Sequence, residues 1–333
     1  MTGDNKIHAK IHACVFGALL ACLPGNSSAL NIGDYPELED LIQTMVEEDG
    51  YPEDELRALI ESAAINEKTL ELMDRQWEAV PWHKYRDLFI NYRRIRNGVE
   101  FWNEHEATLK KAEAEYGVPA SVIVSIIGVE THYGKRKGNS NVLNSLVSLT
   151  AAYPRRSKYF KKELRVFLNL ARRESIEAGS VYGSYAGAIG IPQFMPSSYE
   201  NHSVDFNGNG IRDLVNEVED AVGSVANYLV NHGWKAGQAI YSDVQGSLPE
   251  SALALVRKSA KPQQTVESLV MSGIEFNSEQ ASQKAALVKL TLENDEYRHI
   301  VAFNNLYVIT RYNNSINYSM AVTELAEEIE QRR

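Results

Sequence analysis

The sequence contains little cysteine, and this shortage limits the chemistry that it can support. Its two cysteines, Cys14 and Cys22, both lie close to the N-terminus of the 333-residue chain. Removal of a leader would leave one cysteine or none, so neither a disulfide nor a cysteine-ligated metal site is expected. The sequence also lacks a His-Glu-x-x-His zinc pair, a phosphate-binding loop and a nucleophilic-serine motif. Zinc, nucleotide and serine-nucleophile chemistries are therefore not predicted.

Positive charge is in the minority as well. Lys and Arg total 34 against 44 Asp and Glu, which gives a net charge of -10. Proteins bind phosphate backbones through clustered Lys and Arg, so this balance argues against nucleic acid as a main partner. A locally basic cleft could still bind an anionic polymer. After the N-terminal stretch, no apolar run is long enough to cross a bilayer, and the length allows two or three packed modules.

The N-terminal stretch resembles an export signal. Lys6 and Lys10 precede an apolar run over residues 11–23, and Ser27-Ser28-Ala29 supplies the small residues of a cleavage site. We therefore expect a signal peptide over residues 1–29, cleaved after Ala29, and a periplasmic protein. Two alternatives stay open. Leu-Leu-Ala-Cys at 19–22 resembles a lipoprotein site, which would anchor an outer-membrane lipoprotein through a lipidated Cys22, and a buried N-terminal helix would show a similar apolar run.

Helical periodicity dominates residues 35–232, and alternation appears only later. Residues 287–293 alternate between apolar and polar side chains, as a strand does, and residues 299–312 are also predicted to be rich in strand. We therefore predict a mainly α fold of the α+β class. A helical region spans residues 30–240, and a small mixed module spans 241–333 and returns to the core at its last helix. The predicted helices span residues 38–48, 53–64, 68–78, 99–116, 119–131, 158–178, 220–232 and 318–331. A further short helix is predicted to start at the capping box Ser197–Glu200.

Glu130 stands near the end of the predicted helix 119–131, in an apolar sequence. Its helical neighbours three, four and seven positions back are Ile127, Ile126 and Ile123. Burial against them disfavours the charged carboxylate and raises its pKa, and the helix dipole acts in the same direction. A carboxyl that stays protonated near neutral pH can act as a general acid at a glycosidic oxygen. The alternative is an ordinary Glu that reaches solvent at a helix end.

A stretch of small residues follows later in the chain. Residues 183–190 read Gly-Ser-Tyr-Ala-Gly-Ala-Ile-Gly, and such residues let backbone and ligand approach closely. Ser184 and Gln193 could hydrogen-bond sugar hydroxyls or acetamido groups, and Phe194 could pack on a sugar ring. Tight packing of a loop against a helix accounts for the same small residues, so both interpretations stay open.

Six motifs occur in one order. They are Val-Glu-Thr-His-Tyr-Gly at 129–134, Tyr-Pro-Arg-Arg at 153–156, the stretch 183–190, Pro-Gln-Phe-Met-Pro-Ser-Ser-Tyr at 192–199, Ser-Val-Ala-Asn-Tyr-Leu at 224–229 and Ile-Thr-Arg-Tyr-Asn at 309–313. This order closely resembles the lytic murein transglycosylase B family. The resemblance runs from about Phe101 to the C-terminal helix.

The resemblance implies a lysozyme-like helical core and non-hydrolytic cleavage of peptidoglycan between N-acetylmuramic acid and N-acetylglucosamine. Glu130 would first protonate the leaving oxygen. It would then accept the proton of the muramyl 6-hydroxyl, which attacks the anomeric carbon and leaves a 1,6-anhydro end. One carboxyl suffices because the substrate's own hydroxyl replaces a second one. The implied partners are peptidoglycan glycan strands, with proteins of the cell-wall synthesis machinery as an open addition.

Motif positions also imply the substrate-binding residues. Those expected to line the sugar cleft are Ser184, Gln193, Phe194, Tyr228, Tyr312 and Asn313. Tyr153, Arg155 and Arg156 lie in a further matching motif, and a planar guanidinium suits the carboxylates of the substrate. A solvated loop charge is the alternative for each arginine.

Residues 205–213 read Asp-Phe-Asn-Gly-Asn-Gly-Ile-Arg-Asp and resemble the first part of an EF-hand calcium loop. The candidate ligands are Asp205, Asn207, Asn209, Ile211 and Asp213. Asn216 stands where the twelfth-position Glu is expected, so Glu217, Glu219 or Asp220 would have to compensate. So few charges imply a weak, structural calcium site. An Asn/Gly turn that needs positive φ is the alternative, and no cofactor is expected for catalysis.

Two other functions remain compatible with these residues. A hydrolase of the goose-lysozyme type would share the fold and the single Glu but deliver water to the anomeric carbon. A non-catalytic peptidoglycan-binding protein would keep the cleft for affinity alone. The complete motif around Glu130 favours an enzyme.

Overall fold

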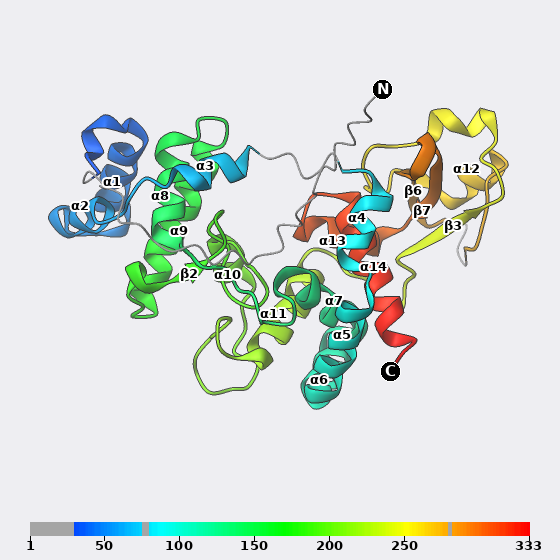
Figure 1. The fold of residues 1–333 in the computed structure, drawn as a ribbon, viewed down its shortest axis with the longest axis horizontal. Helices are drawn as coiled ribbons and strands as arrows, with labels where there is room; N and C mark the ends of the chain where they lie inside the picture. Colours follow the sequence, from blue (N-terminus) through cyan, green and yellow to red (C-terminus); the bar gives the residue numbers. More distant parts are fainter. Residues whose placement is uncertain (1–29, 75–79, 279–281) are drawn as a thin grey trace, which may run out of the picture.

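The computed structural model describes residues 30–74, 80–278 and 282–333, which form a mostly helical fold with one small sheet at one end (Figure 1). The predicted mainly α fold of the α+β class is therefore confirmed. The expected signal peptide and both cysteines lie outside the described residues. Within those residues no single helix has the length and apolar character to cross a membrane. Two consecutive helices, α6 (Glu106–Tyr116) and α7 (Ala120–Thr131), meet that criterion together by length and composition, but they are bent by 116°.

The first helices of the described chain pack with two later helices at the end of the molecule opposite the sheet (Figure 1). Arg165 links the two groups because its guanidinium bonds Asp49 at 2.7 Å and Glu48 at 2.8 Å. The Tyr51 hydroxyl donates to the Leu168 carbonyl at 2.8 Å. This end contains α1 (Pro36–Asp49), α2 (Glu53–Glu61), α3 (Glu67–Met73), α8 (Val142–Ala152) and α9 (Ser157–Arg173).

The central helix is α7 (Ala120–Thr131), whose residues 120–128 are all buried. Pro119 precedes its first residue, and His132 and Tyr133 end it with left-handed φ values of 55° and 62°. These consecutive left-handed residues turn the chain away directly after Glu130. The helices that pack on α7 are α5 (Tyr92–Glu104), α6 (Glu106–Tyr116), α11 (Val218–Asn231) and α14 (Ile316–Glu330), and α4 (Trp82–Phe89) and α10 (Pro196–His202) extend this layer.

The sheet has the order β4-β6-β7-β3-β5, and all of its neighbouring strands are antiparallel. Its centre is β6 (Lys284–Thr291) paired with β7 (Tyr297–Ala302), in a register that sets Val288 opposite Ile300. One face packs on Met320 of α14, so α14 joins the sheet to the central helices. The remaining strands and the helix on the other face are β3 (Tyr241–Gln245), β4 (Gln264–Thr265), β5 (Glu275–Phe276) and α12 (Val266–Met271).

Short elements complete the fold. A two-stranded ladder of β1 (Ser140–Asn141) and β2 (Tyr182–Gly183) brings the small-residue stretch beside the start of α8. Short 3-10 helices occur at Ile32–Asp34, Ala178–Ser180, Glu250–Leu255 and Glu293–Asp295.

Several predictions of secondary structure were wrong or missing. The helix predicted over residues 158–178 ends at Arg173, no helix was predicted for α4 or α12, and the helix predicted over 68–78 extends beyond the described residues after Asp74. The single helix predicted over residues 99–116 is two helices, α5 and α6, which meet at His105. The predicted strand 299–312 ends at Ala302, and α13 (Asn304–Tyr312) follows. Its β-branched residues favour strand locally, but Leu306 and Ile309, three apart, are both buried on one helical face. Helix α8 was not predicted because it is buried on most sides and shows no amphipathic pattern.

Candidate active site

Glu130 lies at the next-to-last position of α7, and its carboxylate faces the C-terminal helix α14. The hydroxyl of Tyr318 on α14 donates a hydrogen bond to Glu130 Oε1 at 2.6 Å. Tyr318 is buried, with 2% of its surface exposed. Sequence reasoning missed Tyr318 because no local spacing connects two residues 188 positions apart. Only the packing of α14 on α7 brings the pair together.

The surroundings of Glu130 change its acidity. Burial raises the pKa of Glu130 to about 7, and the hydrogen bond from Tyr318 limits that rise. Ile123, Ile126 and Ile127, the helical neighbours named from the sequence, are fully buried. Burial likewise raises the pKa of Tyr318 well above its ordinary value, so its hydroxyl stays a donor throughout the physiological range. A protonated carboxyl at neutral pH is therefore available at this position.

Aromatic rings from four segments gather beside this carboxyl. Phe194 lies 5.5 Å from Tyr228 and 5.8 Å from Tyr312 between ring centroids. Tyr312 in turn stacks with Tyr318 at 6.4 Å with an interplanar angle of 12°. The Tyr312 hydroxyl donates to the Pro192 carbonyl at 2.5 Å. The structure thus brings together Phe194, Tyr228 and Tyr312, which were expected in the sugar cleft, and adds Tyr318 to them.

The small-residue stretch is held in place by the side chains that were expected to bind sugar. Ser184 Oγ accepts hydrogen bonds from the backbone N–H groups of Ala188 at 3.0 Å and Ala186 at 3.3 Å. Gln193 has a left-handed φ of 51°, and its side-chain amide donates to the carbonyls of Gly190 at 2.8 Å and Lys137 at 3.0 Å. Both side chains therefore fix the loop, and the carbonyl oxygen of the Gln193 side chain stays available as an acceptor.

The Tyr-Pro-Arg-Arg motif forms the turn between α8 and α9. Arg155 is exposed and forms an ion pair with Asp74 at 2.6 Å. The guanidinium of Arg156 lies 4.4 Å from the Tyr159 ring centroid. The buried Tyr153 hydroxyl donates to the Met73 carbonyl at 3.4 Å. This turn thus joins α3 to the start of α9.

Tyr228 lies among the aromatic rings beside Glu130. Burial raises the pKa of Tyr228 to about 12, and the charges of both Tyr159 and Glu130 contribute to the increase. Tyr228 is therefore close enough to interact with both groups. Asn313 follows Tyr312 and is exposed. Ring contacts thus link Phe194, Tyr228 and Tyr312 to Tyr318 and Glu130, whereas Arg156 contacts the rings of Tyr159 and Phe160 on α9.

The calcium-like loop folds around Asp205. Its carboxylate accepts the backbone N–H groups of Gly208 and Gly210, both at 2.7 Å. The side-chain amides of Asn207 and Asn209 both donate to Glu217, at 2.7 and 2.8 Å. Glu217, rather than a residue at the twelfth position, therefore faces the loop interior.

The other acidic residues of the loop are engaged elsewhere. Asp213 accepts the backbone N–H groups of Val215 and Asn216 at 2.8 and 2.9 Å. Asp220 is fully buried and accepts from the backbones of Phe206 and Asp213. In the described ranges, no three His, Cys, Asp or Glu side chains are grouped as metal ligands. The donor set that fits a hard cation is thus two carboxylates, Asp205 and Glu217, with amide and backbone oxygens.

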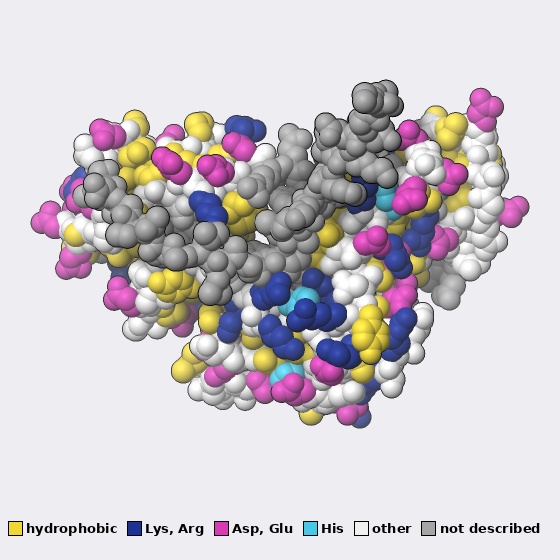
Figure 2. Space-filling model, in the orientation of Figure 1, with side chains coloured by type: hydrophobic (Ala, Val, Ile, Leu, Met, Phe, Trp, Pro, Cys, Tyr) yellow, Lys and Arg dark blue, Asp and Glu magenta, His cyan; other side chains and the backbone are white. Residues whose placement is uncertain are grey.

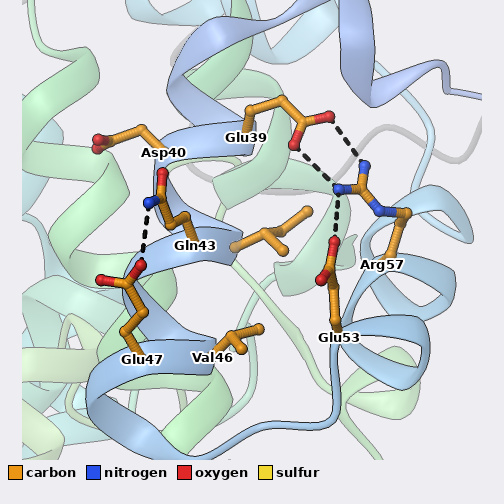
Figure 3. A pocket seen from close by; sticks show the side chains of 8 residues that line it. Glu39, Asp40, Gln43, Val46, Glu47, Glu53 and Arg57 are labelled. Atoms are coloured by element: carbon orange, nitrogen blue, oxygen red, sulfur yellow. Dashed lines mark hydrogen bonds and ion pairs between the residues drawn. The ribbon is translucent and has the colours of Figure 1, made fainter.

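A surface groove between α1 and α2 holds a second group of charged residues (Figure 3). Arg57 bridges Glu39 at 2.9 Å and Glu53 at 3.2 Å, and Gln43 donates to Glu47 at 2.9 Å. The groove lies at the end of the molecule far from α7 (Figure 1). Its charged groups pair with one another, so it is not a rival for the active site.

The site and fold can now be compared with known proteins. Residues 33–327 match the family model described as the transglycosylase SLT domain. The chain belongs to the lytic murein transglycosylase B family. Its relative in Escherichia coli, membrane-bound lytic murein transglycosylase B, is 36% identical over 311 residues, which cover 89% of this chain and 84% of the relative.

Solved structures of lytic transglycosylases agree with this membership. Soluble lytic transglycosylase SltB1 from Pseudomonas aeruginosa is 39% identical and superposes with a TM-score of 0.84, covering 90% of this chain and 99% of that one. Escherichia coli lytic transglycosylase Slt35, solved in complex with calcium, is 36% identical with a TM-score of 0.83, covering 92% and 96%. The predicted family, lysozyme-like fold class and activity class are thus confirmed: this lytic murein transglycosylase acts on peptidoglycan.

Proposed function

We propose that the enzyme cleaves the bond between N-acetylmuramic acid and N-acetylglucosamine without water, with Glu130 as its only acid/base group. Glu130 donates its proton to the glycosidic oxygen as the bond to the anomeric carbon breaks. The resulting carboxylate then accepts the proton of the muramyl 6-hydroxyl. That hydroxyl oxygen bonds to the anomeric carbon, and a 1,6-anhydro end results. Glu130 ends the cycle protonated, as it began.

The observation that supports this mechanism best is the isolation of one protonated carboxyl. The pKa of Glu130 rises to about 7 through burial, and no other carboxylate contributes to that shift in the described part of the chain. Enzymes that use two carboxyls hold them roughly 5 to 9.5 Å apart, where each would affect the other's pKa. A single carboxyl favours a nucleophile supplied by the substrate.

The aromatic cluster supports binding of a glycan strand along the same path. Tyr312 is partly exposed and could pack on a sugar ring, and the buried rings of Phe194 and Tyr228 support it from beneath. The Gln193 side-chain carbonyl and the exposed Asn313 provide polar groups beside them. Ser184, by contrast, supports the loop and reaches sugar only through the backbone that it orders.

Mass spectrometry of muropeptides released from purified peptidoglycan tests the proposed reaction directly. We expect all new glycan ends to carry 1,6-anhydro-muramic acid. Because no water is added, each released fragment should be lighter than its hydrolysed counterpart by the mass of one water molecule, about 18 Da. Reducing ends would instead indicate a hydrolase of the goose-lysozyme type. That result would be compatible with Glu130 as the acid/base group but would rule out the substrate hydroxyl as the nucleophile. Intact strands after binding would favour a non-catalytic binding protein.

We also propose that the loop 205–213 binds calcium weakly and in a structural role, with Asp205 and Glu217 as the charged ligands. The amides of Asn207 and Asn209 would present their oxygens to the ion, since amide oxygen and nitrogen exchange places by a simple flip. The relative Slt35 was solved in complex with calcium. With so few carboxylates the affinity should lie near the millimolar class of extracellular calcium modules.

Thermal unfolding with and without calcium tests this loop. At calcium concentrations about 100 times the Kd, binding to the folded state adds about 2.7 kcal/mol to the free energy of unfolding. We therefore expect a higher thermal unfolding midpoint in about 100 mM calcium than in the same concentration of magnesium. The Asp205→Asn variant should have the same midpoint in both salts. Asp243→Asn, in the sheet, is the matched control and should keep the calcium response. Equal unfolding midpoints of the unaltered chain in the two salts would contradict calcium binding and favour the interpretation of the loop as an Asn/Gly turn.

A further inference from the structure

The hydroxyl of Thr131, the last residue of α7, links the end of that helix to the loop of residues 189–194, which we call the Gln193 loop. The hydroxyl donates a hydrogen bond to the Ile191 carbonyl at 2.8 Å and accepts one from the Gly134 backbone N–H at 3.0 Å. A second acceptor, the Ile127 carbonyl within α7, lies farther away at 3.2 Å. A hydroxyl carries a single hydrogen, so the shorter contact with Ile191 is the better bond. The proposed mechanism assigns no role to Thr131.

Both segments joined by this hydroxyl have a backbone conformation that residues other than glycine rarely adopt. His132 and Tyr133, which follow Thr131 directly, have φ values of 55° and 62°. In the Gln193 loop, Gln193 itself has a φ of 51°. Left-handed conformations of such residues cost free energy, and they persist where the surrounding structure holds them. The end of α7 and the Gln193 loop therefore both need partners that fix their shape.

Side chains from two helices attach the Gln193 loop to the rest of the site. The Pro192 carbonyl accepts the hydroxyl of Tyr312, the last residue of α13, at 2.5 Å. Thr131 supplies the corresponding bond from α7, to the carbonyl of the preceding residue. Thr131 is also the residue next to Glu130 in the chain. The loop is therefore attached to the helix of the proposed acid/base group by the side chain that follows that group.

The hydrogen bonds of Thr131 are shielded from water. Figure 2 shows Lys and Arg side chains at the surface where Figure 1 places α5 and α7, but Thr131 is only 1% exposed and does not belong to that surface. The two segments also touch directly, since a Cβ atom added to Gly134 would lie 3.5 Å from Ile191 Cγ1. Loss of the hydroxyl would remove this donor from the buried Ile191 carbonyl, which costs more free energy than the bond itself contributes. The Gln193 loop would then shift until that carbonyl found another donor.

We infer that Thr131 is a positioning residue, whose hydroxyl fixes the Gln193 loop relative to the Glu130 carboxyl. The inference rests on the proposed function, because it assumes that Glu130 reacts with a sugar held beside that loop. An acid/base group is effective only when it is held close to the reacting atoms, and a displacement of about 1 Å reduces the rate by up to about 100-fold. Thr131 itself does not touch the sugar; it acts through the two segments that it joins.

Replacement of the hydroxyl by a methyl group of similar size tests this role. Thr131→Val should reduce kcat for the release of anhydro-muropeptides by about 10- to 100-fold, whereas Thr131→Ser, which keeps the hydroxyl, should stay within about threefold of the parent. The falling limb of kcat/KM against pH should coincide with that of the parent. Burial and the hydrogen bond from Tyr318 determine the pKa of Glu130, and the substitution changes neither.

Thr323→Val is the matched control for this substitution. Thr323 is also 1% exposed, and its hydroxyl donates to the Ser319 carbonyl at 2.7 Å within α14. The control thus loses a buried hydroxyl but no bond between two segments, so its kcat should stay within about twofold of the parent. Equal kcat values of the two valine variants, measured well below both unfolding midpoints, would overturn the inference. A large loss of kcat in Thr131→Ser would also overturn it, because the hydroxyl is present in that variant.

Hydrogen–deuterium exchange of the full chain measures the link without catalysis. Thr131→Val should speed exchange of the backbone amides in residues 132–136 and 189–194 by at least about tenfold, and Thr323→Val should change neither segment. Unchanged exchange in 189–194 would overturn the inference even if kcat fell. If Thr131→Val does not fold, Thr131→Ala removes the hydroxyl without adding a methyl group next to the loop, and the same results are expected.

The proposed function can fail separately from this inference. If Glu130→Gln kept full activity, the proposed function would fail. Faster exchange in both segments, together with a lower kcat of Thr131→Val, would still support Thr131 as the residue that positions the Gln193 loop. Faster exchange with an unchanged kcat would overturn the inference, because the position of the loop would then not affect the reaction.

Discussion

Glu130→Gln is expected to reduce kcat by at least about 10³-fold, because one residue performs both proton transfers. The amide has the shape of the carboxyl but cannot donate a proton to the glycosidic oxygen or accept one from the 6-hydroxyl. It can still accept the hydrogen bond from Tyr318, so substrate binding should change little. Release of anhydro-muropeptides, measured by mass spectrometry over time, checks the rate.

The chain offers a matched control for this substitution. Glu327, on the same helix as Tyr318, is exposed, but partial burial of its carboxyl and the nearby Glu324 still raise its pKa. It too accepts a hydrogen bond from a tyrosine, Tyr241, at 3.4 Å. Because Glu327 lies at the sheet side of α14, Glu327→Gln should keep kcat within about twofold, as surface substitutions usually do. A comparable loss of kcat in both variants would indicate that removing either carboxylate damages the fold. The loss in Glu130→Gln would then not identify Glu130 as a catalytic residue.

Protein stability distinguishes a lost proton donor from a damaged fold. Between the ordinary pKa of 4.5 and about 7, folded Glu130 holds a proton that the unfolded chain releases. The unaltered enzyme therefore loses stability as the pH rises through this window. Glu130→Gln removes that cost, so at pH 8 its free energy of unfolding should exceed that of the parent by about 3 kcal/mol, and at pH 4 the two should agree. If the inactive variant is more stable than the parent at pH 8, the substitution has removed the proton donor and left the fold intact.

The sequence predicted the parts of this site that lie within single motifs. The acidity of Glu130 followed from Ile123, Ile126 and Ile127 on one helical face, and the structure buries all three. The mainly α fold followed from periodicity, because amphipathic helices such as α9 carry their pattern in consecutive residues. The local pattern did not predict α8, because this helix is buried on most sides, and it predicted strand for α13, because β-branched residues favour strand.

The spacing of residues along the sequence could not predict long-range contacts in the site. Tyr318 joins Glu130 only because α14 crosses α7 after the sheet has returned the chain to the core. Glu217, by contrast, was among the residues predicted to compensate at the calcium-like loop, and its carboxylate does accept from the amides of Asn207 and Asn209. The partner of Glu130 is set by helix packing, which a single sequence does not encode as a pattern.

Tyr318→Phe should move the pH dependence of the enzyme to higher pH and reduce kcat by about tenfold. The hydrogen bond from Tyr318 lowers the pKa of Glu130, so its removal lets burial raise that pKa further above about 7. The reaction starts from protonated Glu130, and kcat/KM therefore falls as the pH rises through this pKa. In the variant this fall should occur at higher pH. The kcat should decrease because the carboxyl loses the contact that orients it.

A pH profile of kcat/KM for three enzymes completes this argument. Tyr241→Phe is the matched control, since it removes the corresponding hydroxyl from Glu327 and leaves Glu130 untouched. Its falling limb should coincide with that of the parent. A lower kcat in Tyr318→Phe with an unshifted limb would show that Tyr318 orients the carboxyl without tuning its acidity. A limb that moved to lower pH would mean that the titrating acid is not Glu130, because loss of this hydrogen bond can only favour the protonated form.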